Sequence, residues 1–152
     1  LGLSFLVVGL GEELFKLVAV YLAVGRSEEF SEPMDGIIYA IAVAVGFSVV
    51  ENILYISAFG LVVAPLRGTI ATLAHIAFSG LAGFFLGKAK FSPRPWPTLA
   101  AGLALSALAH GFYDFLLITQ QVSPIMLILT VIGLQYLLFM AIQRAVRSSP
   151  GR

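Results

Sequence analysis

The sequence predicts an all-α polytopic membrane protein, and its composition and hydropathy are the observations behind this prediction. Of the 152 residues, 59% are hydrophobic and 11% are charged, whereas soluble domains carry about 25% charged residues. The mean hydropathy is +0.99. These values, with a net charge of +1, exclude a soluble globule, a disordered tail and a nucleic-acid-binding protein. The chain has no cysteine, so thiolate catalysis, thiolate metal sites and disulfides are excluded.

Apolar stretches long enough to cross a bilayer with modest tilt predict about five helical spans. They cover residues 3–24, 36–59, 69–87, 98–119 and 122–142. The segments 25–35, 60–68 and 88–97 between them each contain proline, and the first and last are also polar. The short link near Gln120 predicts a tight hairpin. We expect residues 1–152 to form a single transmembrane domain. Because no Met and no basic segment precede the first span, further N-terminal spans are expected before it.

The basic residues outside the predicted spans predict the orientation, because cytoplasmic loops are enriched in Lys and Arg. Most of them fall on one side of the membrane: Arg26, Lys88, Lys90, Arg94, Arg144, Arg147 and Arg152. Only Arg67 falls on the other side. The C-terminus and the loops at 25–35 and 88–97 are therefore predicted to be cytoplasmic in a cell membrane. Residue 1 and the loop at 60–68 are predicted to face outward.

Polar and ionisable residues inside the predicted spans are the candidates for function. They are Glu12, Glu13, Lys16, Glu51, Asn52, His75, His110 and Asp114. A charged side chain near the bilayer centre costs about 2.5–3.5 kcal/mol, so these groups must face one another, water or a metal. The acids and imidazoles lie about five to nine residues from the outer ends of four alternating helices. One common site in the outer half of the membrane is predicted.

The spacing within two of the helices supports a shared site. Glu12 and Glu13 precede Lys16 by four and three residues, so all three lie on one helix face and Lys16 is expected to be the counter-ion. His110 and Asp114 are also one turn apart, which lets the carboxylate accept an imidazole N–H or lets both residues bind one cation.

Other polar or small residues are assigned supporting roles. Asn52 is expected to form a hydrogen bond to a neighbouring helix. Ser79, Gly83 and Gly87 recur at helical spacing and predict close helix packing.

Carboxylates and imidazoles in one site suit the activation of water. One group takes a proton from water while others stabilise the oxyanion or protonate the leaving amine. The candidate catalytic residues are Glu12, Glu13, Glu51, His75, His110 and Asp114. Alternatively, Glu51, His75 and His110 would hold a zinc ion, which accepts imidazole nitrogen and carboxylate oxygen. No HExxH motif is present, and the residues leave both alternatives open.

Four short motifs occur in order on successive spans. They are Glu12-Glu13-x-x-Lys16, Phe47-x-x-x-Glu51-Asn52, His75 before a small-residue stretch, and His110-x-x-x-Asp114. Together they resemble the PrsW family of intramembrane proteases. The related CPBP group, which includes the CAAX prenyl endopeptidases, has EExxxR, FxxxH and often HxxxN instead. Lys16, Glu51 and Asp114 therefore favour the PrsW branch.

The resemblance implies an endopeptidase that cuts membrane-anchored proteins such as anti-sigma factors, and we expect the cleavage near the outer face of the membrane. It implies that Glu12 and Glu13 are central to hydrolysis, with His75 and His110 beside them. By similarity to the CPBP arrangement, Glu12 would activate water, and His110 and Asp114 would lie near the oxyanion. PrsW relatives are often classed with metallopeptidases, which implies zinc as the cofactor if the site uses a metal.

The alternative function is a proton- or cation-coupled transporter or channel with a buried Glu–His relay. Such proteins show inverted repeats and broken helices. The sequence has no obvious repeat and no proline inside its first four predicted spans. The protease is therefore the favoured hypothesis.

Overall fold

The computed structural model describes residues 2–120 and 122–148. Long helices dominate this part of the chain: α1 (Gly2–Val24), α2 (Pro33–Phe59), α4 (Thr72–Lys90), α5 (Pro95–Thr119) and α6 (Pro124–Ser148). The described residues form no strand, which confirms the predicted all-α class. The predicted positions of residue 1 and Arg152 lie outside the described residues.

Four helical stretches of the described chain are long and apolar enough to cross a membrane. They are Pro33–Phe59, Leu61–Lys90, Pro95–Thr119 and Pro124–Ser148. A polytopic helical bundle is therefore confirmed. The remaining long helix, α1, has 23 residues and carries Glu12, Glu13 and Lys16. Its place as a fifth span stays a prediction.

The helices extend further than the predicted apolar spans at several ends. Three of them begin at a proline, namely Pro33, Pro95 and Pro124, because the first turn of a helix tolerates the missing N–H. Helix α4 includes Lys88 and Lys90 in its last turn, where positive charge is favourable to the helix dipole. Lys88 therefore marks the end of the apolar stretch but not the end of the helix, which continues to Lys90.

The predicted loop at 60–68 was wrong. Gly60, with φ of 81°, ends α2, and the chain continues through helical turns: η1 (Leu61–Val63), α3 (Ala64–Leu66) and the π-helical turn η2 (Arg67–Ala71). These turns lead directly into α4. Pro65 is tolerated because it stands in the first turn of α3. Arg67, predicted to be an outer loop charge, is therefore in a helical turn and only 7% exposed.

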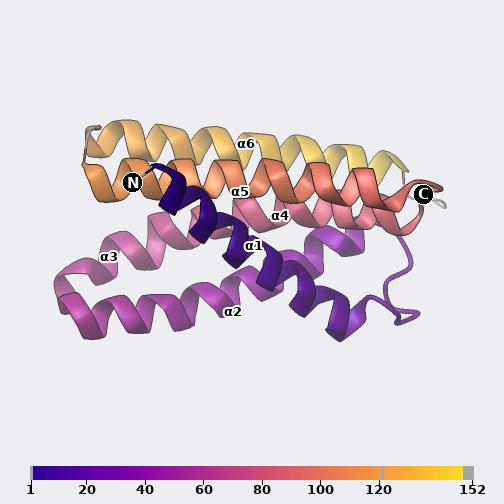
Figure 1. Cartoon of the computed structure of the whole chain (residues 1–152), viewed down its shortest axis with the longest axis horizontal. Helices are drawn as coiled ribbons and strands as arrows, with labels where there is room; N and C mark the ends of the chain where they lie inside the picture. Colours follow the sequence, from indigo (N-terminus) through magenta and orange to yellow (C-terminus); the bar gives the residue numbers. More distant parts are fainter. Residues whose placement is uncertain (1, 121, 149–152) are drawn as a thin grey trace.

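Helix α4 is the centre of the bundle and contacts α1, α2, α5 and α6. In the most apolar stretch of Leu61–Lys90, the segment that contains α4, 72% of residues are buried, compared with 28% in α2 and α6. The α1–α2 and α4–α5 connections lie at the same end of the molecule as the C-terminus (Figure 1). The N-terminus, α3 and the α5–α6 link lie toward the opposite end. This arrangement matches the predicted order of alternating spans.

Glycines let the helices that carry the polar residues approach closely. A Cβ on Gly36 of α2 would collide with the backbone of Gly83 and Gly87 of α4, so these residues pack as predicted. A Cβ on Gly9 of α1 would lie 2.8 Å from the backbone nitrogen of Gly111 in α5. The contact places α1 against α5 one turn from Glu12 and Glu13.

Candidate active site

Glu13 is the centre of a polar cluster inside the bundle. Its side chain is 0% exposed. Oε1 accepts hydrogen bonds from Lys16 Nζ at 2.8 Å and from His110 Nδ1 at 2.9 Å. Oε2 accepts from Ser79 Oγ at 2.9 Å and from Ser106 Oγ at 3.5 Å. Glu13 thus ties α1 to α4 and α5 with both of its oxygens satisfied.

Lys16 connects the carboxylates of α1 to a histidine of α4. It is 1% exposed, and its Nζ lies 2.8 Å from Glu13 Oε1 and 3.6 Å from Glu12 Oε2. Nζ also lies 2.9 Å from His75 Nδ1 and 4.2 Å from the centroid of the Phe47 ring. Because an ammonium group only donates, His75 Nδ1 is the acceptor. The predicted pairing of Lys16 with both acids is present.

The other nitrogen of His75 contacts a carboxylate of α2. His75 Nε2 lies 2.8 Å from Glu51 Oε2, and the same oxygen accepts from Arg67 Nη2 at 2.9 Å. The guanidinium carbon of Arg67 lies 3.4 Å from the centroid of the Tyr55 ring. His75, Glu51, Arg67 and Tyr55 therefore form one continuous chain of contacts.

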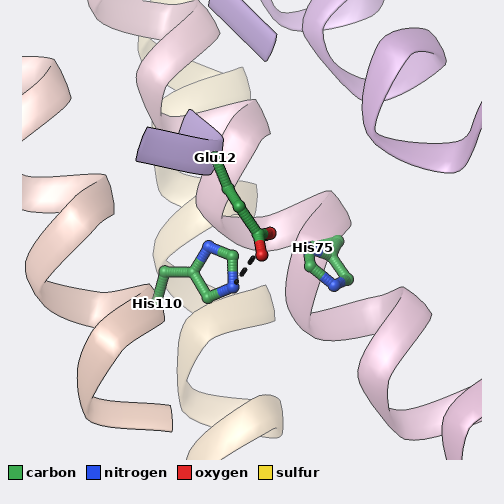
Figure 2. A group of neighbouring side chains, drawn as sticks. All are labelled: Glu12, His75 and His110. Carbon is green, nitrogen blue, oxygen red and sulfur yellow. Dashed lines mark ion pairs between the residues drawn. The ribbon is translucent and has the colours of Figure 1, made fainter. Parts of the chain in front are cut away.

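Glu12 differs from its neighbour because its Oε2 atom is buried without a hydrogen-bond partner among the described residues. This oxygen lies 3.6 Å from His110 Nε2, and the same nitrogen lies 3.5 Å from Asp114 Oδ2. Figure 2 shows the Glu12 carboxylate directed toward the space between the rings of His110 and His75. The side chains of Glu12 and Asp114 are 22% and 20% exposed. They border the accessible edge of the cluster.

Three side chains of the described chain have donor atoms close enough to share a metal ion. One ligand atom each from Glu12, His75 and His110 lies within 4.8 Å of the others. Two imidazoles and one carboxylate are a ligand set that catalytic zinc uses. The unpartnered Glu12 oxygen supports the fit, since a bound cation would satisfy it. To act as a ligand, His75 must release Lys16 or Glu51, whereas His110 Nε2 already faces Glu12.

Glu51, which the sequence analysis placed among the metal ligands, is not part of this group. It contacts Nε2 of His75. Metal-binding histidines commonly bind the metal through one ring nitrogen and donate the N–H of the other to a carboxylate such as this one. Glu13 stands behind His110 in the same way.

The sequence model of the PrsW family intramembrane metalloproteases matches residues 2–143. The chain belongs to the PrsW family. It is 40% identical over 119 residues to protease PrsW of Geobacillus kaustophilus, an alignment that covers 78% of this chain and 53% of the relative. It is 34% identical over 137 residues to protease PrsW of Oceanobacillus iheyensis, covering 86% of this chain and 64% of the relative.

Protease PrsW of Bacillus subtilis is 38% identical over 118 residues, with 75% of this chain and 53% of the relative covered. The chain therefore spans between about half and two thirds of the length of these PrsW relatives. No solved structure matches the chain.

Most of the predicted site residues of this PrsW-family chain lie in one cluster built by α1, α2, α4 and α5. They are Glu12, Glu13, Lys16, Glu51, His75, His110 and Asp114. Asn52 instead donates from Nδ2 to Thr72 Oγ1 at 3.2 Å. It links α2 to α4, as expected for a helix-to-helix hydrogen bond.

Several members of the cluster were not among the site residues predicted from the sequence. Arg67 was read as a loop charge, although it precedes His75 by eight residues and therefore falls near the same face of a continuous helix. Ser79 was assigned to packing, yet its hydroxyl donates to Glu13. Ser106 has the same role and was not singled out. Both serines stand one turn from a histidine, His75 or His110, and this spacing was the available signal.

Proposed function

We propose that this chain contains the catalytic centre of an intramembrane endopeptidase that hydrolyses peptide bonds of membrane-anchored proteins. The observation that carries the proposal is the buried, unpartnered Oε2 of Glu12, 3.6 Å from His110 Nε2. A carboxylate oxygen that accepts no hydrogen bond from the described residues, with Lys16 Nζ and His110 Nε2 each 3.6 Å away, is suited to bind and deprotonate water. Anti-sigma factors, the substrates suggested by the family resemblance, are the proposed substrate class.

In the metal-free form of the site, Glu12 is assigned as the base of the hydrolysis. It takes a proton from water while the water oxygen forms a bond to the scissile carbonyl carbon, and the carbonyl electrons move onto oxygen. When the carbonyl re-forms, the C–N bond breaks and the proton passes from Glu12 to the leaving amine. His110 and Asp114 border the space that the scissile carbonyl has to enter.

Glu13 is assigned a supporting role in the same reaction. Both of its oxygens accept hydrogen bonds, so it has no free oxygen for water among the contacts of the described chain. It fixes the orientation of His110 through Nδ1 and balances the charge of Lys16. This division of contacts supports Glu12 as the glutamate that meets the water.

A divalent metal, with zinc as the first candidate, would be held by Glu12, His75 and His110. When bound, such an ion supplies Lewis-acid polarisation of the carbonyl and of water. Glu12 is then a ligand, and Asp114 is the carboxylate that remains beside His110 to take the proton. We favour this form because the chain belongs to a metalloprotease family.

The proposed orientation places the C-terminus in the cytoplasm and the site toward the outer face of a cell membrane. The described basic residues at the C-terminal end of the bundle support it, namely Arg26, Lys88, Lys90, Arg94, Arg144 and Arg147. Cleavage would accordingly take place near the outer surface.

The test is a cleavage assay with a single-span substrate, using the whole protein in detergent or in vesicles. Wild type is compared with Glu12→Gln and with Glu28→Gln, which removes an exposed loop carboxylate. Cleavage by wild type and Glu28→Gln, together with loss in a folded Glu12→Gln variant, supports the proposal. Equal cleavage by wild type and Glu12→Gln contradicts it. Metal content and sensitivity to chelators, measured on the same preparations, separate the metal-bound form of the site from the metal-free form.

A further inference from the structure

Each histidine of the site has a carboxylate at one ring nitrogen. For His110 it is Glu13, whose Oε1 lies 2.9 Å from Nδ1. For His75 it is Glu51, whose Oε2 lies 2.8 Å from Nε2. The two pairs are built in opposite senses, because Glu13 meets Nδ1 and Glu51 meets Nε2.

These partners fix the position of the proton on each ring. An ionised carboxylate only accepts, so His110 carries a proton on Nδ1 and His75 carries one on Nε2. The contact with Lys16 agrees, since its ammonium donates to the bare Nδ1 of His75. The two histidines are therefore held in opposite tautomers. With the proton on Nε2, Nδ1 of His75 is the nitrogen with a free lone pair, and it faces Lys16 of α1.

The carboxylates are supported differently. Glu13 has Lys16, Ser79 and Ser106 around it in addition to His110. Glu51 has the guanidinium of Arg67, 2.9 Å from the same oxygen that accepts from His75. Arg67 is itself 7% exposed and stacks on Tyr55. Arg67 is the first residue of the π-helical turn η2, which contacts α2.

We propose that Arg67 is a positioning residue for the reaction, acting on His75 through Glu51. The guanidinium holds Oε2 of Glu51 in the place where it accepts the Nε2–H of His75. The imidazole then keeps one tautomer and one orientation, with Nδ1 facing Lys16. This inference rests on the proposed function, because it assigns His75 to the reacting centre.

The chemistry of arginine suits this role better than that of lysine. A guanidinium is planar, stacks on an aromatic ring and presents donors in a fixed fork, whereas an ammonium is a strongly hydrated point charge on a flexible stem. Loss of a partner behind a site histidine reduces activity or metal affinity by about 10–100-fold. We therefore expect Arg67→Lys to recover only part of what Arg67→Gln loses.

The activity test uses the complete protein and a single-span substrate. Arg67→Gln is expected to lower kcat by about 10–100-fold while KM stays near the wild-type value, with a smaller loss in Arg67→Lys. Arg144→Gln, which removes an exposed arginine of α6, is the matched control and is expected to behave as wild type. Wild-type kcat in a folded Arg67→Gln variant would overturn the proposal.

A second readout does not depend on activity. The chain has only two histidines, so ring-nitrogen NMR of histidine-labelled protein gives two patterns, which His110→Gln assigns. Wild type is expected to show one Nε2–H and one Nδ1–H tautomer. Arg67→Gln is expected to lose the single Nε2–H pattern of His75 and keep that of His110. An unchanged His75 pattern in Arg67→Gln would overturn the proposal.

The two readouts separate this inference from the proposed function. If wild type cleaves and Glu12→Gln does not, the function stands, whatever Arg67→Gln does. If wild type fails to cleave any single-span substrate, the proposed function fails, and the NMR comparison alone decides the role of Arg67.

Discussion

Glu12 and Glu13 are adjacent in the chain, yet their carboxylates lie in opposite chemical environments. Both oxygens of Glu13 accept hydrogen bonds, whereas Oε2 of Glu12 is buried without one among the described residues. Successive residues of a helix point about 100° apart. One carboxylate therefore enters the packed interior between α4 and α5, while the other stays at the accessible edge.

The two adjacent glutamates are expected to respond differently to the same substitution. Glu12→Gln removes the carboxylate that faces His110, so cleavage is lost. Because the variant keeps the volume of a partly exposed side chain, the melting temperature changes little. Glu13→Gln removes the anion that faces Lys16, and an uncompensated buried charge costs about 3–5 kcal/mol. Thermal unfolding in detergent and cleavage of a single-span substrate measure both effects.

Glu28→Gln is the control for this comparison, because Glu28 is exposed in the α1–α2 connection. An inactive but fully stable Glu13→Gln beside an active Glu12→Gln would reverse the roles assigned to the two residues.

Close contact between α1 and α5 is expected to depend on Gly9. A Cβ at this position would lie 2.8 Å from Gly111 N and 2.9 Å from Ala107 O, and backbone atoms cannot move aside without separating the helices. Gly9→Ala should therefore lower the melting temperature and shift Glu12 away from His110, reducing cleavage. Overpacking of this kind costs about 1–3 kcal/mol.

Gly11 provides the matched control for Gly9. A Cβ there meets nothing within 4 Å, and alanine is favoured over glycine inside a helix by about 0.8–1.0 kcal/mol. Gly11→Ala is expected to retain cleavage and to match or exceed wild-type stability. Equal behaviour of the two alanine variants would show that α1 and α5 do not pack as described.

The sequence predicted much of the fold and the site because burying charge in a membrane is costly. Glu12, Glu51, His75 and His110 could be grouped from their depth alone, since ionisable groups inside the bilayer must meet one another. Hydropathy could not reveal the helical turns at 61–71. Gly60, Pro65 and Gly68 are typical of a loop, but the chain stays helical there, and this hid Arg67 from the predicted site.

The distinct roles of the acids were also beyond the sequence. Glu12 and Glu13 are the same residue type at neighbouring positions, so the sequence does not distinguish them. In the structure, Ser79 and Ser106, on two other helices, donate hydrogen bonds to Glu13. Likewise, Glu12 and Glu51 fit a metal equally well by residue type. In the structure, Glu51 contacts Arg67, whereas Glu12 lies beside His110.

Zinc binding is expected to distinguish ligands from the residues behind them. Elemental analysis of purified protein should show that His75→Ala, His110→Ala and Glu12→Gln lose the ion. Glu51→Gln should retain it with an affinity weaker by about 10–100-fold, because Glu51 contacts a ligand and not the ion. Glu28→Gln is again the control.

Two results of the zinc measurement would contradict the ligand set of Glu12, His75 and His110. One is retention of zinc in Glu12→Gln with complete loss in Glu51→Gln, which would restore the ligand set predicted from the sequence. The other is the absence of zinc from active wild type, which would leave Glu12 as a metal-free base.

The orientation of the bundle is expected to place the turns before α4 outside the cell and the end of α6 inside it. The chain has no cysteine, so single-cysteine variants report one position each. Val62, in the turn η1 directly before α3, is 84% exposed, and Ser148 is exposed at the last residue of α6. Helix α3 lies at the opposite end of the bundle from the last turn of α6 (Figure 1). With a membrane-impermeant maleimide, Val62→Cys should react in intact cells and Ser148→Cys only after permeabilisation. The reverse pattern would place the basic end outside, against the positive-inside rule, and would move the proposed cleavage to the cytoplasmic side of the membrane.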